Sequence, residues 1–406
     1  MKNILLCGLK YNSNYGDPII NDSCRYIVQK SIKDDVKIDE IDLEGKSNFN
    51  KKYKLNIFKR QIIKVNIKIL NFIKKCFGKI KLNGLYNFID YITWYVSDEY
   101  AIFNNYYKEK IKNSDIIIFS GGGMVKYRYQ NCYQYIDYIT KIADKSDIPV
   151  CLNSVGVEGY DDKNVKCRVL KKALNRKCVK MITTRDDIMT LKKYICNENI
   201  YIDKVSDPAV FISDVYNIKK KENNKIIGLG VCRGRLFLDN KINYTEEHLI
   251  ELWKKIIIEL ERRGNEWCIY TNGLEADNIF AQKLLESIKA NGDNIKIPNS
   301  PYELVNIISG FKGIIATRLH SNIIAYSLQV PAIGLVWNNK LKMFGQNIGY
   351  PERFIEVENF DEKNIVDKME KAIMELYEKI KPEVYRKSEE DSINKFLNEF
   401  LENNKE

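Results

Sequence analysis

The chain alternates between short apolar runs and segments of helical periodicity, and this alternation limits its fold more than any other feature. Apolar runs such as "KNILLCGL" (2–9), "DIIIFSGGG" (115–123) and "IPVCLNSVGV" (148–157) have the length of strands, and helix-like segments separate them. Strands that alternate with helices form parallel sheets whose faces are covered. The sequence therefore predicts an α/β protein built on parallel sheets.

The same alternation starts again at "NNKIIGLGVCRGR" (223–235) and continues to "PAIGLVW" (331–337). A length of 406 residues exceeds what one hydrophobic core usually supports, so two domains are expected. The polar stretch "SDVYNIKKKENNK" (213–225) is the predicted linker. We expect two Rossmann-like domains that face each other across a cleft. The predicted divisions are 1–215 with a helical insert at about 45–112, then 216–360, and then C-terminal helices at 361–406 that return to the first domain.

The insert contains a strongly basic segment. Residues 51–81 hold eleven Lys or Arg and no acidic residue, which accounts for the whole net charge of +11. Their apolar residues recur at spacings of three and four, which predicts an amphipathic helix. Either this helix docks on the domain through its apolar face, or it is a peripheral anchor for anionic lipid. Nucleic acid is not an expected partner, because the lysines alternate with isoleucine rather than with stacking aromatics.

Cysteine usage and the N-terminus predict the compartment. The ten cysteines are scattered without a C-x-x-C pair, and several lie within apolar runs, as expected of reduced, buried thiols. The first apolar run is too short for a signal peptide, and no stretch reaches the ~18 apolar residues of a membrane span. We therefore expect a cytoplasmic protein, held at the inner face of the plasma membrane if the basic helix is an anchor.

The segment "GIIATRLHSN" (313–322) is the strongest candidate for a functional site. It places Arg318 and His320 where an apolar strand leads into a helix, the point at which open α/β sheets bind ligands. Arg318 can grip a phosphate or carboxylate, Ser321 or Asn322 can cap the helix, and His320, one of only two histidines, can move a proton. The alternative is that His320 only caps the helix and Arg318 forms a surface ion pair.

Other strand ends add weaker candidates. Arg185 ends the run "MITTR" and is followed by Asp186, so it either binds substrate or forms a structural ion pair. A triple glycine permits close approach of a ligand to the backbone, or it only makes a tight turn. Because ligands bind where strands end, further residues at strand ends are predicted to bind the ligand: Gly121, Gly122, Gly123, Asn14, Asp17, Glu158, Arg233 and Lys340. The sequence contains no metal-ligand cluster, Gly-x-Ser-x-Gly elbow or Walker loop, so no metal is expected.

Taken together, these strand-end motifs resemble those of the polysaccharide pyruvyl transferases. The matching pieces occur in the family's order: "NYGD" (14–17), "GGG" (121–123), "SVGVEG" (154–159), "TRD" (184–186), "SDPAVF" (206–211), "TRLHSNIIAYSLQVPAIGL" (317–335) and Lys340. The most specific part is Arg-x-His followed by a helix, Val-Pro and Lys. The chain departs from the pattern in the length of its insert at 45–112.

The resemblance implies a two-domain fold like that of the GT-B glycosyltransferases. It also implies transfer of the carboxyvinyl skeleton of phosphoenolpyruvate to two hydroxyls of a sugar, which gives a cyclic pyruvate ketal and needs no cofactor. The acceptor would be a surface polysaccharide or its lipid-linked oligosaccharide precursor, and Arg185, Arg318, His320 and Lys340 would be the donor-binding and catalytic positions. Two alternatives remain: a GT-B glycosyltransferase that uses a nucleotide sugar, and a non-catalytic paralogue in a polysaccharide assembly complex.

Overall fold

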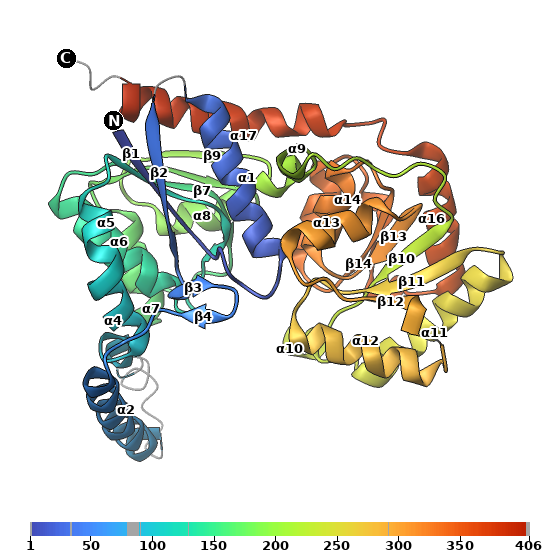
Figure 1. Cartoon of the computed structure of the whole chain (residues 1–406), viewed down its shortest axis with the longest axis horizontal. Coiled ribbons are helices and arrows are strands. Elements are labelled where there is room, and N and C mark those ends of the chain that lie inside the picture. The colour runs from blue at the N-terminus through green and yellow to red at the C-terminus, as the bar shows by residue number, and fades with distance from the viewer. Residues whose placement is uncertain are drawn as a thin grey trace. The chain divides into compact units, whose positions relative to one another are not determined.

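Two separate parallel sheets organise the protein in the computed structural model (Figure 1). The structure describes residues 2–32, 35–78, 89, 91–128, 130–290 and 292–402. Every described strand pair within the two large sheets is parallel, and helices connect most consecutive strands, although only Ser120 and Gly121 separate β5 from β6. The predicted α/β class with parallel sheets is confirmed.

The first sheet has seven strands in the order β2-β1-β5-β7-β8-β9, with β6 paired to β7. Its central strands are apolar on both faces, as parallel sheets require, and all eight residues of β7 are buried. The strands are β1 (Lys2–Gly8), β2 (Val36–Asp42), β5 (Ile116–Phe119), β6 (Gly122–Val125), β7 (Val150–Val157), β8 (Val179–Thr184) and β9 (Tyr201–Lys204).

Local side chains start the helices between these strands. Asn164 accepts a hydrogen bond from the backbone of the first turn of α7, and Asp187 does the same for α8. Outside the insert, this half contains α6 (Cys132–Lys145), α7 (Val165–Leu174), α8 (Ile188–Tyr194) and the π-helical turn η6 (Asn398–Glu402). The helices α1 (Gly16–Ser31) and α17 (Pro382–Leu397) belong to it only in part.

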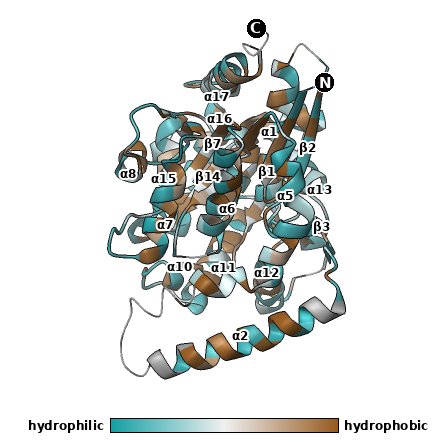
Figure 2. Ribbon diagram, turned by 90° about the vertical axis from the view of Figure 1, so that its left-hand side faces the viewer, coloured by the Kyte–Doolittle hydropathy of each residue, from teal (hydrophilic) through white to brown (hydrophobic). Residues whose placement is uncertain are grey.

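The insert contains a small hairpin as well as the predicted helices. The hairpin pairs β3 (Lys46–Asn48) with β4 (Lys51–Lys52), and the long helix α2 covers Ile57–Gly78. Apolar and polar residues alternate around α2, as Figure 2 shows, in agreement with the predicted amphipathic helix. Further described elements of the insert are α4 (Asp98–Ile102), η1 (Phe103–Tyr107) and α5 (Lys108–Lys112).

The second sheet has six strands in the order β12-β11-β10-β13-β14-β15. Its core includes the fully buried Trp253 of α11, whose first turn is closed by a capping box between Thr245 and His248. The second histidine of the chain thus has a structural role. The strands are β10 (Ile226–Gly230), β11 (Glu266–Tyr270), β12 (Ile295–Lys296), β13 (Gly313–Ala316), β14 (Ala332–Val336) and β15 (Phe354–Glu356).

Helices also separate the strands of the second sheet. The described helices are η2 (Pro208–Phe211), α9 (Ile212–Tyr216), α10 (Leu236–Asp239), α11 (Glu246–Arg262), α12 (Glu275–Ser287), η3 (Gly292–Asn294), α13 (Pro301–Ser309), α14 (Leu319–Ser327), α15 (Asn339–Asn347), η4 (Pro351–Arg353), η5 (Val357–Asn359) and α16 (Glu362–Glu375). Within the described ranges, no helix is both long and apolar enough to cross a membrane. None of the nine described cysteines forms a disulfide, and eight of them are buried.

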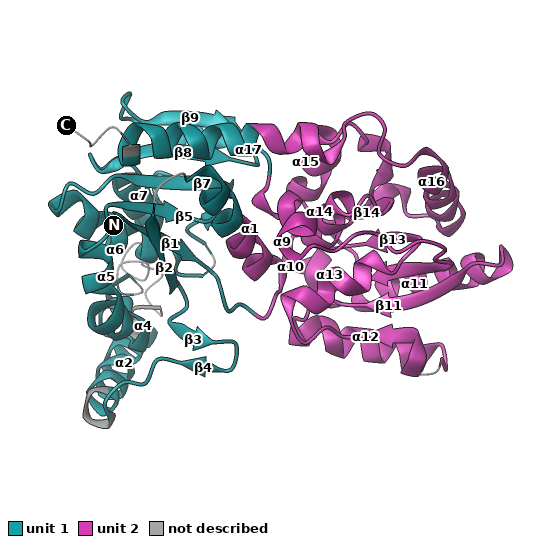
Figure 3. Cartoon of the chain, turned by 45° about the horizontal axis from the view of Figure 1, so that its top comes forward, with its two compact units in different colours: residues 1–12, 24–206, 388–406 teal, residues 13–23, 207–387 magenta. Residues whose placement is uncertain are grey.

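Each sheet belongs to its own compact unit (Figure 3). Unit 1 contains residues 1–12, 24–206 and 388–406, and unit 2 contains residues 13–23 and 207–387. The chain passes from unit 1 to unit 2 between Ser206 and Asp207, shortly before the predicted linker at 213–225. The first residues of that predicted linker lie in helix α9. Of the C-terminal helices, α16 belongs to unit 2, while α17 begins in unit 2 and ends in unit 1.

Candidate functional site

His320 lies at the carboxyl edge of the second sheet, as the sequence predicts. Strand β13 ends at Ala316, Arg318 is the N-cap residue of α14, and His320 is the second residue of that helix. The histidine is buried, with 8% of its surface exposed. Its Nε2 atom lies 4.0 Å from Oδ2 of Asp207, a buried residue that also caps η2. The carboxylate of Asp207 therefore lies close to the imidazole of His320, and the two side chains form a candidate ion pair.

The N-terminal segment 13–23 packs against this histidine. Gly16, the first residue of α1, leaves no room for a side chain, because a Cβ atom there would lie 2.7 Å from Cβ of His320 and closer still to its ring. The backbone N–H of Tyr15 donates to the carbonyl of Asn272, 2.9 Å away, which fixes the segment to the loop after β11. The glycine of the "NYGD" motif is thus required by the close approach of α1 to His320.

Arg318 is held by a carboxylate that the sequence analysis missed. Its Nε donates to Oδ2 of Asp277 at 2.9 Å and its Nη2 donates to the other oxygen, while Asp277 also accepts from the backbone N–H of Arg233 at 2.8 Å. Burial lowers the pKa of Arg318, but the charge and hydrogen bonds of Asp277 outweigh this effect and raise it. Asp277 is fully buried in the first turn of α12, and no local pattern marks it.

This pairing orients the guanidinium through two of its three nitrogen atoms. The Nη1 group of Arg318 makes no hydrogen bond to any residue that the structure describes. Arg318 is therefore a fixed cation beside His320 rather than the surface ion pair of the alternative interpretation.

The other predicted residues of unit 2 lie at the same edge with different partners. The hydroxyl of Ser321 donates to Oδ1 of Asn272 at 2.6 Å, and both residues are buried. Nδ2 of Asn14 lies 3.5 Å from Oδ2 of Asp17 at the start of α1. The Arg233 side chain pairs with Asp239 of α10. Lys340, half-buried in the first turn of α15, follows β14 and so lies beside the strand that leads to His320.

Unit 1 brings its predicted residues to the carboxyl edge of the first sheet. Arg185, directly after β8, is 7% exposed, and its Nε lies 4.0 Å from Oδ1 of Asp186. Oδ2 of Asp186 in turn accepts from the backbone N–H of Val157 at 3.1 Å. A Cβ on Gly156 would lie 3.0 Å from that oxygen and 3.2 Å from Cα of Gly123, so the backbones approach closely here.

The glycine run and Glu158 belong to the same edge. Gly121 and Gly122 have φ values of +109° and +85°, which favour glycine, and they lead from β5 into β6. Glu158 follows β7 directly, is half-buried, and donates its backbone N–H to the carbonyl of Val125 at 2.9 Å. Because β7 pairs with both β6 and β8, these residues and Arg185 are neighbours in unit 1. The predicted convergence of Arg185 with Arg318 and Lys340 involves both units and stays a prediction.

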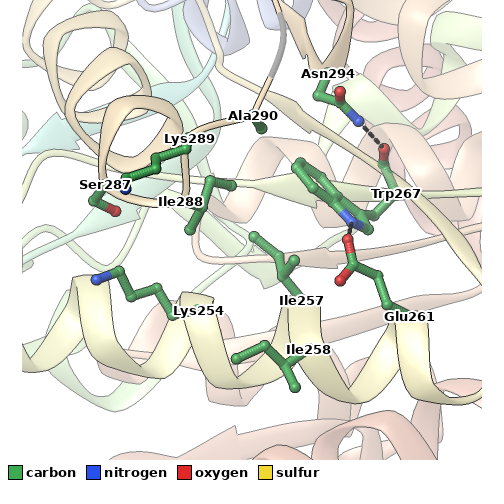
Figure 4. Close-up of a pocket in the computed structure, with 10 residues that line it drawn as sticks. All are labelled: Lys254, Ile257, Ile258, Glu261, Trp267, Ser287, Ile288, Lys289, Ala290 and Asn294. Carbon is green, nitrogen blue, oxygen red and sulfur yellow. Dashed lines mark hydrogen bonds between the residues drawn. The ribbon is translucent and has the colours of Figure 1, made fainter.

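A cavity of about 580 Å³ lies at the amino edge of the second sheet, away from the residues described above (Figure 4). Trp267, near the start of β11, donates from Nε1 to Glu261 of α11, and its carbonyl accepts from Asn294. Parallel α/β sheets bind ligands at the opposite, carboxyl edge, so this cavity is not the predicted site. Within the described ranges, no group of three or more His, Cys, Asp or Glu side chains is arranged to hold a metal ion.

Comparison with known families shows which protein family the chain belongs to. The family model described as "Polysaccharide pyruvyl transferase" matches residues 14–339, which include every motif of the two sheet edges from "NYGD" to the end of β14. The chain belongs to the polysaccharide pyruvyl transferase family. It is therefore a transferase of the polysaccharide pyruvyl transferase type, and none of the curated proteins matches it individually.

Solved structures place this pyruvyl transferase among GT-B-type folds. It matches S. aureus MnaA in complex with UDP with a TM-score of 0.54 at 12% identity, covering 99% of this chain and 97% of the other. It matches a UDP-N-acetylglucosamine 2-epimerase from Listeria monocytogenes with a TM-score of 0.56 at 10% identity, covering 99% and 98%. The UDP-GlcNAc 2-epimerase of Neisseria meningitidis gives a TM-score of 0.52 at 12% identity. At such low identities the likeness shows the fold alone.

Proposed function

We propose that this pyruvyl transferase moves the carboxyvinyl group of phosphoenolpyruvate onto two hydroxyls of one sugar and releases phosphate. A proton adds to the methylene carbon, and the first hydroxyl bonds to the cationic carbon that results. The second hydroxyl then displaces phosphate and closes the ketal. Of the two hydroxyl protons, one balances the proton now in the methyl group and the other leaves with the phosphate.

The pair of His320 with Asp207 is the observation that carries this proposal. A proton must reach the methylene carbon and protons must leave two hydroxyls, and the imidazole is the group of unit 2 best suited to both tasks. His320 is buried at the start of a helix, with Asp207 4.0 Å from its Nε2 to stabilise the imidazolium. General acid–base catalysis of this kind contributes about 10²–10⁴-fold to a rate.

The anionic donor requires fixed cations and backbone donors. Arg318, oriented by Asp277, precedes His320 by two residues at the start of α14, and Lys340 lies in the first turn of the next helix. We propose that these two residues bind the phosphate and carboxylate of phosphoenolpyruvate. In this proposal Arg185, beside the glycines of unit 1, supplies the third cation. Arg318 and Arg185 then stabilise charge in the transition state as well as in the bound donor.

The test is a reaction with phosphoenolpyruvate and candidate lipid-linked oligosaccharides, followed by phosphate release and product mass. His320→Ala is expected to abolish ketal formation while the melting temperature stays nearly unchanged. His248→Ala is the matched control, because it removes the only other histidine, which caps α11. Full activity of His320→Ala would show that this histidine is only structural. Turnover of a nucleotide sugar without phosphoenolpyruvate would favour the glycosyltransferase alternative.

We also propose that helix α2 holds the enzyme at an anionic membrane surface. Four apolar side chains on this helix are exposed: Ile62 by 47%, Val65 by 56%, Ile69 by 52% and Phe72 by 69%. No side chain of α2 that the structure describes is buried, which argues against docking of this face on the described part of the domain. The basic residues around it match anionic headgroups, each worth about 1 kcal/mol near the surface.

Vesicle flotation tests this second proposal. The protein is expected to float with vesicles that contain phosphatidylserine in low salt, and to remain in solution in high salt or with neutral vesicles. Flotation should be lost when four cations of the helix are changed to Gln: Lys64, Lys68, Lys74 and Lys75. The control removes four exposed lysines elsewhere in unit 1: Lys141, Lys145, Lys163 and Lys177. Equal flotation of both variants would reject the membrane contact and favour a soluble acceptor.

A further inference from the structure

The insert helps to form a polar pocket at the carboxyl edge of the first sheet. The pocket has a volume of about 350 Å³, within the range of about 300–1,000 Å³ typical of small-molecule sites. The residue that follows β1 and the start of α6 contribute to its lining. Lys46 and Lys52 of the β3–β4 hairpin and Glu99 of α4 come from the insert. This pocket therefore lies on the edge that carries Arg185.

Hydrogen bonds hold the carboxylate of Glu99 in position. Its Oε2 accepts from Nδ2 of Asn131 at 2.9 Å and from the hydroxyl of Tyr135 at 3.2 Å. Burial, followed by the charge of Glu99, raises the pKa of Tyr135, so this hydroxyl stays protonated and continues to donate. The partly buried carboxylate is thus preorganised by two donors from α6 and its cap.

The same arrangement leaves two acceptor atoms on residues that line the pocket without a hydrogen bond from the described residues. Oε1 of Glu99 and the side-chain oxygen of Asn131 accept no hydrogen bond from the residues that the structure describes. Lys52 adds a donor on the exposed hairpin. A hydroxyl group both donates and accepts, so a ligand with several hydroxyls can satisfy acceptors and donor together.

Charge distinguishes this pocket from a site for the donor. Its two acidic side chains, Glu44 and Glu99, are balanced by Lys46 and Lys52, and Lys46 already pairs with Glu44 at 2.7 Å. Phosphoenolpyruvate carries both a carboxylate and a phosphate, and a pocket without net positive charge does not favour it. A neutral, polyhydroxylated ring fits the lining better.

We propose that this pocket binds a neutral sugar ring of the acceptor, and that the insert thereby selects which acceptor the enzyme modifies. This inference rests on the proposed transfer to a sugar, since it assigns the acceptor's place in unit 1. Glu99 accepts from a hydroxyl of the sugar through Oε1, and Asn131 accepts from a second hydroxyl. Both residues bind the acceptor and have no part in moving protons.

Titration of the full-length protein with methyl glycosides tests the assignment. Saturation-transfer NMR is used with the methyl glycosides of the common hexoses and of their 2-acetamido analogues, without phosphoenolpyruvate. At least one glycoside should bind. Glu99→Gln should raise its Kd about tenfold or more, because it removes the charge of the acceptor, and Asn131→Ala should raise it about fivefold, as loss of a neutral hydrogen bond does. Glu109→Gln is the matched control, because the side chain of this exposed glutamate of the same insert pairs with Lys112 and with no other residue that the structure describes.

The outcomes separate this inference from the proposed function. Affinity for phosphoenolpyruvate should be the same in Glu99→Gln and wild type. Loss of that affinity, equal glycoside binding by all variants, or no binding of any glycoside by wild type would overturn the assignment. Phosphate release from phosphoenolpyruvate is followed separately. If glycoside binding depends on Glu99 but no phosphate is released with any acceptor, the proposed reaction is wrong and the sugar site stands.

Discussion

Substitution of Gly16 by alanine tests how the start of α1 positions His320. At the first position of a helix, Gly→Ala is ordinarily neutral or slightly stabilising, because alanine loses less backbone entropy on folding. Here the new Cβ would lie 2.7 Å from Cβ of His320, whereas ordinary contact begins at 3.4 Å. The two backbones must therefore separate by at least 3.4 − 2.7 = 0.7 Å. Rotation of the imidazole cannot relieve this contact, because Cβ is fixed to the backbone of α14.

We expect Gly16→Ala to lower the reaction rate more than the free energy of unfolding. A shift of roughly 1 Å in a catalytic group costs about 10²-fold in rate, or about 2.7 kcal/mol of transition-state stabilisation. Overpacking costs about 1–3 kcal/mol in stability, and the exact value depends on how far the N-terminal segment can yield. The movement should also change the 4.0 Å separation of His320 from Asp207.

The assay compares phosphoenolpyruvate-dependent phosphate release and urea unfolding for Gly16→Ala and for Gly292→Ala. Gly292 is the matched control, because a Cβ there meets no atom within 4 Å. Gly16→Ala should lose about 10²-fold in kcat and Gly292→Ala should keep wild-type activity. Wild-type kcat and stability in Gly16→Ala would refute the inference that this glycine sets the position of His320.

Three further substitutions follow from the site. Asp277→Ala should destabilise the protein by about 3 kcal/mol in urea unfolding, because it leaves the largely buried Arg318 without its carboxylate; a loss below about 1 kcal/mol would contradict the pairing. Asp207→Asn should lower kcat about 10²-fold or more with a nearly unchanged melting temperature, since asparagine also caps a helix; unchanged kcat would remove Asp207 from the mechanism. Gly156→Ala should lower stability by about 1–3 kcal/mol, measured by thermal unfolding, because its Cβ meets Asp186 and the backbone opposite; wild-type stability would show that the first sheet yields there.

The periodic features of the structure could be predicted from the sequence, because they depend on local patterns. Apolar runs of strand length between helical segments predicted two parallel sheets, and the three- and four-residue spacings of the insert predicted α2. Strand ends predicted where Arg318 and His320 would lie, since parallel topology brings the carboxyl ends of strands to one edge.

Contacts between distant segments could not be predicted in this way. Asp277 lies on an ordinary-looking helix, and nothing in "EADN" shows that it faces Arg318. Residues 13–23 were assigned to the first domain because they follow β1, yet they pack in unit 2 against His320. The "SDPAVF" segment was noted without a role for its aspartate, because the approach of Asp207 to His320 is a tertiary contact.

The hairpin of the insert shows a further limit of pattern reasoning. The basic, helix-like composition of 45–112 predicted helices throughout, but Lys46–Asn48 pairs with Lys51–Lys52 in a small antiparallel sheet. Strands this short have too few residues for a two-residue period to be visible. The pocket that these strands help to form was therefore not foreseen from the sequence.

A reaction in D₂O shows whether phosphoenolpyruvate is the donor and whether its methylene carbon is protonated. The acceptor is a lipid-linked oligosaccharide from a surface polysaccharide pathway, and the product is examined by mass spectrometry and NMR. We expect a cyclic ketal whose methyl group carries one solvent deuterium, formed together with one phosphate per product and absent with His320→Ala. A product without deuterium in that methyl group, or transfer of a sugar from a nucleotide donor instead, would contradict it.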